Sequence, residues 1–138
     1  MADEPDAVSP TLVLAADWDD PGSWNEPLLC FVRSFPAEDA VRLVLPFEPE
    51  HFDGEALAAE IARLAASAGL DLERCAELVL APVTEADEYP RLAAGALALL
   101  VAPGRAAPGW ANGLPIRVSR IASREDLAGL VRPLDVLG

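Results

Sequence analysis

The stretch Glu77–Pro103 constrains the fold of this chain more than any other part of the sequence. It places a short helical segment between two apolar runs, Leu78–Ala81 and Leu97–Ala102. Neither run shows the polar alternation of a half-exposed strand. The pattern therefore favours parallel strands that are covered on both faces, and a buried helix is the alternative. Asp87 is the predicted N-cap of the helix between the runs. The stretch thus predicts a right-handed crossover of strand, helix and strand.

A similar unit is predicted at the start of the chain. The strand Thr11–Ala15 precedes a helix that opens with a capping box of Ser23 and Glu26 and ends before Pro36. Apolar side chains recur along this helix every three or four residues, which is typical of one buried face. The predicted face consists of Trp24, Leu28, Phe31, Val32 and Phe35. We interpret this aromatic stripe as core and not as a cofactor site.

Two more units complete the pattern. A strand at Val41–Pro46 is followed by a helix that Asp53 caps and Gly69 ends. After the central stretch, a short strand is predicted at Ile116–Val118, and Ser123 begins a last helix. Strands and helices therefore alternate along the whole chain.

Alternation of this kind predicts an α/β fold, a three-layer Rossmann-like sandwich with a five-stranded, mostly parallel sheet. The expected strand order is 3-2-1-4-5, with 2-1-3-4-5 as the alternative. Residues 1–10 are expected to form an acidic flexible tail, and residues 11–138 a single domain. Ligands of such sheets bind outside the carboxyl ends of the strands. Here that edge consists of the loops 16–22, 46–53, 82–86 and 103–114.

The charge of the chain narrows the range of partners. The formal net charge is −13, which makes nucleic acid and anionic membranes poor partners. Residues 1–69 hold 14 acidic side chains and 3 arginines, whereas residues 70–138 hold 9 and 7, so an anionic ligand should prefer the second half. The cations are all arginine, a composition typical of GC-rich bacterial genomes. No signal peptide and no membrane span are evident, which predicts a cytoplasmic protein.

Cysteine and histidine are scarce. Cys30 and Cys75 are predicted to be buried free thiols, because a cytoplasmic chain seldom holds a disulfide. His51 is the single histidine, so histidine alone cannot build a zinc site, and we interpret it as a surface residue. No metal and no cofactor are predicted.

The second half of the chain carries a family resemblance. Val83–Pro103 reads VTEADEYPRLAAGALALLVAP and Gly109–Ile116 reads GWANGLPI. Together they resemble the C-terminal, donor-binding half of GT-B glycosyltransferases of the family 4 type, in which a similar helix and strand precede a Gly-rich loop. The resemblance implies a Rossmann-like domain that binds a nucleotide sugar.

Two features depart from that family. Its first loop carries glycine and basic residues for the pyrophosphate, whereas Asp17, Asp19 and Asp20 occupy the equivalent place here. Its pair of glutamates near the fourth strand has no counterpart in the loop 104–119. No catalytic residue is therefore carried over. The candidate substrate-binding residues are Arg105, Trp110, Asn112 and Gly113.

The aspartate cluster allows another interpretation. Asp17 and Asp19 at the end of a strand could hold Mg²⁺ through oxygen ligands, as acidic clusters do in haloacid-dehalogenase-like phosphatases, receiver domains and GT-A glycosyltransferases. The first two classes also use a lysine, and this chain has none. A role in the turn is the simpler interpretation.

The sequence leads to two hypotheses on function. The first is a glycosyltransferase-like domain that resembles the nucleotide-sugar-binding half of a GT-B enzyme and lacks the complete catalytic machinery on its own. It would bind a nucleotide sugar weakly and would need a partner domain or a second copy. The alternative is a non-catalytic interaction or structural module with a Rossmann-like fold.

Overall fold

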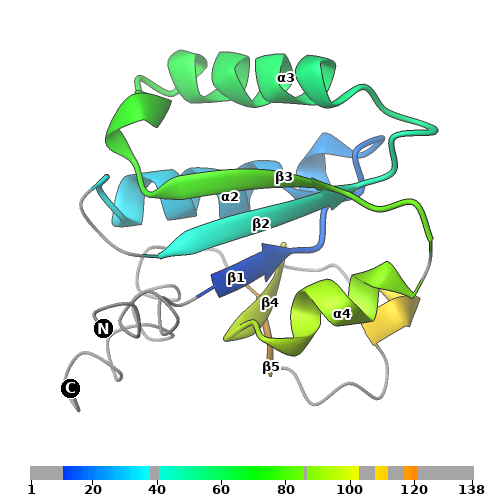
Figure 1. Cartoon of the computed structure of the whole chain (residues 1–138). Coiled ribbons are helices and arrows are strands. Elements are labelled where there is room, and N and C mark those ends of the chain that lie inside the picture. Colours follow the sequence, from blue (N-terminus) through cyan, green and yellow to red (C-terminus); the bar gives the residue numbers. More distant parts are fainter. Residues whose placement is uncertain (1–10, 38–40, 86, 103–107, 112–116, 121–138) are drawn as a thin grey trace, which may run out of the picture.

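A computed structural model describes residues 11–37, 41–85, 87–102, 108–111 and 117–120 of the chain (Figure 1). The strands are β1 (Thr11–Leu14), β2 (Arg42–Phe47), β3 (Glu77–Pro82), β4 (Ala98–Val101) and β5 (Arg117–Arg120). The α-helices are α2 (Asn25–Ser34), α3 (Gly54–Ser67) and α4 (Glu88–Ala94). Three 3-10 turns are η1 (Pro21–Ser23), η2 (Leu72–Arg74) and η3 (Gly109–Ala111).

The strands form a parallel sheet in the order β3-β2-β1-β4-β5. The central strand β1 pairs with both neighbours, because Val13 lies opposite Val44 on β2 and Leu99 on β4. The predicted α/β class and the predicted strand order are therefore confirmed. The structure describes the burial of every side chain in the four strands β1, β2, β3 and β4, whereas the prediction was of five strands. β5 extends the edge by backbone pairing with β4.

One face of the sheet is covered by α2 and α3. Large side chains fill the space between, and Phe31 is fully buried at the centre of α2. The predicted stripe of α2 is buried throughout: Trp24, Leu28, Phe31, Val32 and Phe35. From α3, Leu57, Ile61 and Ala65 are buried. This face holds most of the described core.

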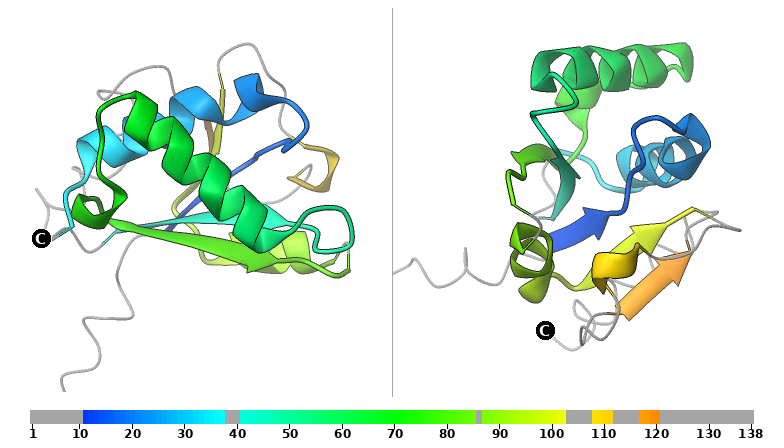
Figure 2. Two further views of the ribbon diagram at one scale, coloured as in Figure 1. Left: turned by 90° about the horizontal axis from the view of Figure 1, so that it is seen from above. Right: turned by 90° about the vertical axis from the view of Figure 1, so that its right-hand side faces the viewer.

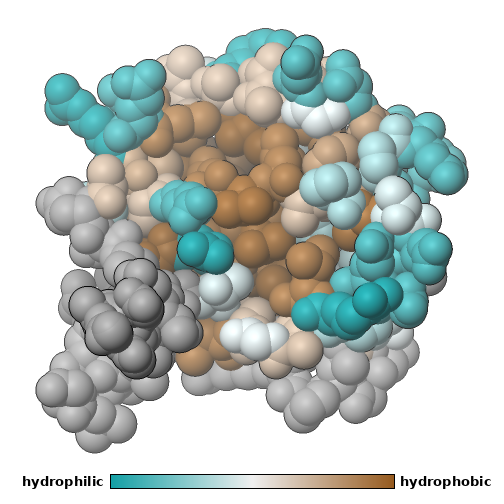
Figure 3. Space-filling view, in the orientation of Figure 1, coloured by the Kyte–Doolittle hydropathy of each residue, from teal (hydrophilic) through white to brown (hydrophobic). Residues whose placement is uncertain are grey.

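The other face carries the short helix α4 and the turn η3. In Figure 1 α4 lies in front of the sheet and α2 behind it, and the right-hand view of Figure 2 separates the two layers in the same way. The buried cluster here consists of Val13, Val44, Leu99 and Ala111. Strand β3 stays half-buried from Leu78 to Ala81, and Figure 3 shows an apolar area near the middle of this view with polar residues around it.

The helix starts agree with the sequence at one position and differ at another. The carboxylate of Asp53 accepts a hydrogen bond from the Glu55 N–H at 3.1 Å, so the predicted cap of α3 is confirmed. At α2 the predicted capping box is wrong. Trp24 occupies the N-cap position without a side-chain hydrogen bond, and the Ser23 hydroxyl bonds into the preceding loop instead. Gly69, with φ of 76°, ends α3 as predicted.

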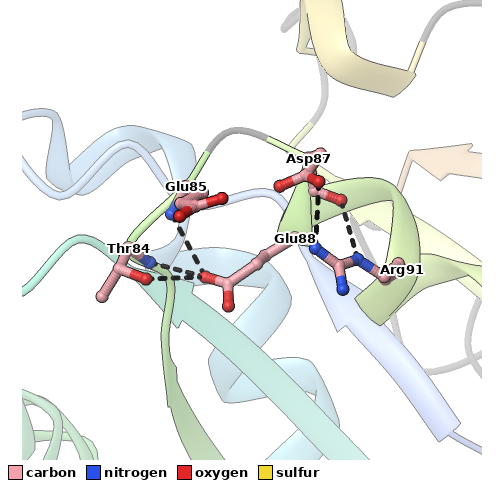
Figure 4. A network of polar contacts seen from close by, with 5 residues as sticks. All are labelled: Thr84, Glu85, Asp87, Glu88 and Arg91. Atoms are coloured by element: carbon pink, nitrogen blue, oxygen red, sulfur yellow. Dashed lines mark hydrogen bonds and ion pairs between the residues drawn. The ribbon is translucent and has the colours of Figure 1, made fainter.

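The start of α4 also differs from the prediction. Asp87 makes no capping bond, and its carboxylate pairs with Arg91 at 3.0 Å. Glu88 takes the capping role, because one of its oxygens accepts hydrogen bonds from the backbone N–H groups of Thr84 at 2.6 Å and Glu85 at 3.2 Å (Figure 4). These bonds lower the pKa of Glu88, the Thr84 bond most strongly.

Both cysteines, Cys30 and Cys75, are buried and form no disulfide, as predicted. Burial raises the pKa of the Cys75 thiol above its usual value. Within the described residues, no helix is long and apolar enough to cross a membrane.

Candidate functional site

A cleft of about 440 Å³ opens at the carboxyl ends of β1, β2 and β4. It lies where the chain order of the strands reverses about β1, since β2 lies on one side of β1 and β4 on the other. This is the position at which open parallel sheets bind their ligands. Its wall consists of Leu14, Ala15, Ala16, Asp17, Asp20, Ser23, Pro46, Glu48, Tyr89, Val101, Pro108 and Trp110. A cleft therefore lies at the edge where the sequence predicted the ligand site.

The loop after β1 is held in shape by hydrogen bonds between its own residues. The Ser23 hydroxyl accepts from the Asp17 N–H at 2.9 Å and lies 3.0 Å and 2.8 Å from the carbonyl oxygens of Asp17 and Asp20. The carboxylate of Asp17 accepts from the Asp19 N–H, and that of Asp20 accepts from the Gly22 N–H. Two aspartates thus act as acceptors within turns, as the simpler interpretation predicted.

Trp18 connects this loop to the end of β2. Its indole N–H donates to the Pro46 carbonyl at 3.0 Å. Its ring lies 5.0 Å from the ring of Trp24, tilted by 52°. The loop after β1 is therefore held to the end of β2 at Pro46, which lines the cleft.

An aromatic pair forms another wall. The rings of Tyr89 and Trp110 are stacked, with centroids 5.1 Å apart and planes 20° apart. The Tyr89 hydroxyl donates to the Glu48 carboxylate at 2.9 Å. Burial, and then the contact with Glu48, raises the pKa of Tyr89 to about 12. The phenol is thus neutral and oriented at physiological pH.

A second hollow adjoins the cleft on the side of β2. It shares Asp17, Glu48 and Tyr89 with the first and adds His51. His51 is exposed and lies 3.5 Å from the Glu48 carboxylate. Its surface position agrees with the prediction, and it makes Glu48 the meeting point of two side chains from different elements.

Of the four predicted binding residues, the structure places Trp110 in the wall of the cleft. Arg105, Asn112 and Gly113 lie outside the described residues. Glu48 and Tyr89 were not predicted. Glu48 follows directly on β2, and this position at the carboxyl edge is the signal that would have found it, whereas Tyr89 lies in the first turn of α4.

Metal binding has little geometric basis in this region. Among the described residues, no group of three or more histidine, cysteine, aspartate or glutamate side chains is placed to hold an ion. The Asp17 and Asp20 carboxylates accept backbone hydrogen bonds.

Comparison of the chain with protein-family models, with characterised proteins and with solved structures found no match in any of the three. The chemistry of the cleft is therefore the basis for inferring function.

Proposed function

We propose that the chain is a glycosyltransferase-like domain of the kind that forms the donor-binding half of GT-B enzymes, and that it binds a sugar-containing ligand without catalysing transfer on its own. The observation that carries the proposal is the cleft at the carboxyl ends of β1 and β4. Trp110, which belongs to the segment that resembles the family, lines this cleft. A complete five-stranded Rossmann-like sandwich is part of the same proposal.

The lack of catalysis follows from what the chain does not offer. Residues 104–119 contain no glutamate, so the acidic pair of the family has no counterpart there. In enzymes of this fold a second half closes over the donor. A closed and dry site is what strengthens electrostatic stabilisation of a transition state. One half with an open cleft supplies binding only.

The proposal is tested by following the backbone ¹H–¹⁵N resonances during titration with UDP-glucose and with GDP-mannose. We expect shifts confined to the carboxyl edge, around Asp17, Glu48 and Tyr89. The expected dissociation constant lies in the millimolar range, which corresponds to a binding free energy of about −4 kcal/mol. No hydrolysis or transfer should accompany binding. Turnover by the isolated chain would contradict the proposed lack of catalysis.

A non-catalytic interaction module is the second candidate. It is favoured by the acidic loop after β1, in which the backbone N–H groups of Asp17, Asp19 and Gly22 are already paired within the protein. If neither nucleotide sugar shifts any resonance at the carboxyl edge, this second candidate replaces the first.

A further inference from the structure

We infer that the cleft recognises its ligand through a sugar ring that donates hydrogen bonds, and that a phosphate group contributes nothing favourable. The inference rests on the proposed function, because it names the ligand class for the same site. Three independent features of the described residues lead to it: the hydrogen bonds of the loop after β1, the supply of donors and acceptors around the cleft, and the aromatic wall.

The first feature is that five backbone N–H groups of the loop after β1, which form part of the usual anion site of such folds, already donate within the loop. Phosphates bind to free backbone N–H groups after the first strand of a parallel sheet and at the helix that follows. Here the N–H of Asp17 donates to the Ser23 hydroxyl, and those of Asp19 and Gly22 donate to carboxylates. The N–H groups of Asp20 and Ser23 donate to backbone carbonyls of the same loop. A phosphate would have to break these bonds while facing negative charge.

The second feature is that the polar groups of the cleft mostly accept. Asp17, Asp20 and Glu48 bring carboxylates, which accept hydrogen bonds when ionised. The hydroxyl proton of Tyr89 is already donated to Glu48, and the Ser23 hydroxyl lies within 3.0 Å of two carbonyl oxygens of its own loop. Among the described residues that line the cleft, Trp110 is the remaining side chain with a donor, a neutral indole N–H. A ligand with several donors, such as hydroxyl or ammonium groups, complements this set.

The third feature is an aromatic surface that is already in place. Trp110 is held by stacking on Tyr89, and Tyr89 is held by Glu48. Trp110 is only half-buried, so part of its surface remains at the cleft. Indole rings contact the apolar faces of sugar rings, and a preorganised ring loses little entropy on binding. Carboxylates beside an aromatic wall match an amino sugar best, since its ammonium pairs with the carboxylates.

The test compares four probes on the full chain by ¹H–¹⁵N titration: methyl glucosaminide, methyl glucoside, UDP and UDP-glucose. We expect methyl glucosaminide to bind about fivefold more tightly than methyl glucoside, the gain of one partly exposed ion pair. UDP alone should leave the carboxyl edge unchanged. Trp110→Ala should weaken the amino sugar about tenfold by loss of the ring contact. Glu48→Gln should weaken binding of the amino sugar by a smaller factor. Thermal unfolding in a calorimeter and the ¹H–¹⁵N spectrum of each variant show whether its fold is intact.

Glu60→Gln is the matched control, because Glu60 pairs with Arg63 on α3 and takes no part in the cleft. It should bind every probe as the unmodified chain does. If UDP binds at the carboxyl edge as tightly as UDP-glucose and neither glycoside binds, the inference is overturned and the proposed function stands. If no probe shifts that edge, both are overturned. Amino-sugar binding that survives Trp110→Ala and Glu48→Gln unchanged also overturns the inference.

Discussion

The two faces of the sheet are built differently, although the same strands supply both. The face under α2 and α3 is covered by helices of 10 and 14 residues and holds three buried aromatic side chains, Trp24, Phe31 and Phe35. The face under α4 and η3 is covered by a helix of 7 residues and a single turn, and small side chains dominate its contacts. Most of the buried apolar area, and so most of the hydrophobic stabilisation, belongs to the first face.

This difference explains where the cleft is found. On the first face large side chains from α2, α3 and the strands form one continuous buried cluster. On the second face the short helix α4 carries Tyr89 in its first turn, where Tyr89 stacks on Trp110. The first face therefore stabilises the fold, and the second positions the aromatic pair of Tyr89 and Trp110 in the wall of the cleft.

The largest expected effect is on the first face. Phe31→Ala should lower the free energy of unfolding by about 3–5 kcal/mol, because it leaves a cavity at a fully buried position. Leu92→Ala on α4 should cost about 1–2 kcal/mol, less than the usual range for a buried leucine, because Leu92 is only half-buried. Urea unfolding at one protein concentration measures both. Equal costs for the two variants would show that the two faces contribute alike.

The first face was predictable from the sequence because its signals are local. The stripe from Trp24 to Phe35 follows the helical period, and Gly69 and Asp53 mark the ends of α3. The capping box at Ser23 was wrong for a physical reason. The loop after β1 folds back, so that the Ser23 hydroxyl bonds to the carbonyl oxygens of Asp17 and Asp20 and not to the backbone of α2.

On the second face we expect an unusual titration of the phenol. Tyr89 is the single tyrosine of the chain, so the absorbance of tyrosinate reports this residue alone. Its midpoint should lie near the raised pKa of about 12, against 10.0 for an ordinary tyrosine. The folded state keeps its proton longer than the unfolded state, so this contribution to stability is complete below pH 10.0 and is lost as the pH rises toward 12.

The variant Glu48→Gln sharpens this prediction. It removes the negative charge but leaves an oxygen that accepts the Tyr89 hydrogen bond. The midpoint should move back toward 10.0 only in part, since burial is the larger cause of the raised pKa. A midpoint near that of free tyrosine in the unmodified chain would mean that Tyr89 is exposed and that the wall is not formed.

A smaller effect is expected at the start of α4. The lowered pKa of Glu88 means that its contribution is present above the ordinary value of 4.5 and is lost as the pH falls below it. Glu88→Gln should therefore lower the melting temperature slightly at neutral pH and by less at about pH 3, where more of Glu88 is protonated. Asp87→Asn, which affects only an exposed ion pair with Arg91, is the control. Thermal melts at the two pH values provide the comparison.

The sequence predicted the edge of the sheet at which the cleft lies, but it did not predict Glu48 and Tyr89 in its wall. The loops at the carboxyl edge follow from the alternation of strands and helices, and the cleft lies among them. The contact of Glu48 with Tyr89 joins residues 41 positions apart, and no local pattern announces it. Trp110 was a candidate because of its loop, whereas its stacking on Tyr89 depends on the packing of α4 against η3.

The central claim is that the cleft favours donors of hydrogen bonds over phosphates because of its carboxylates, and Asp17→Asn tests it most directly. Asparagine keeps the oxygen that accepts from the Asp19 N–H, so the loop should retain its shape. Dissociation constants of methyl glucosaminide and UDP are measured by calorimetry on both proteins. We predict that the variant binds the amino sugar about twofold to fivefold more weakly, and that UDP shows no detectable binding to either protein. An unchanged affinity for the amino sugar, or detectable binding of UDP to the unmodified chain, would contradict the account.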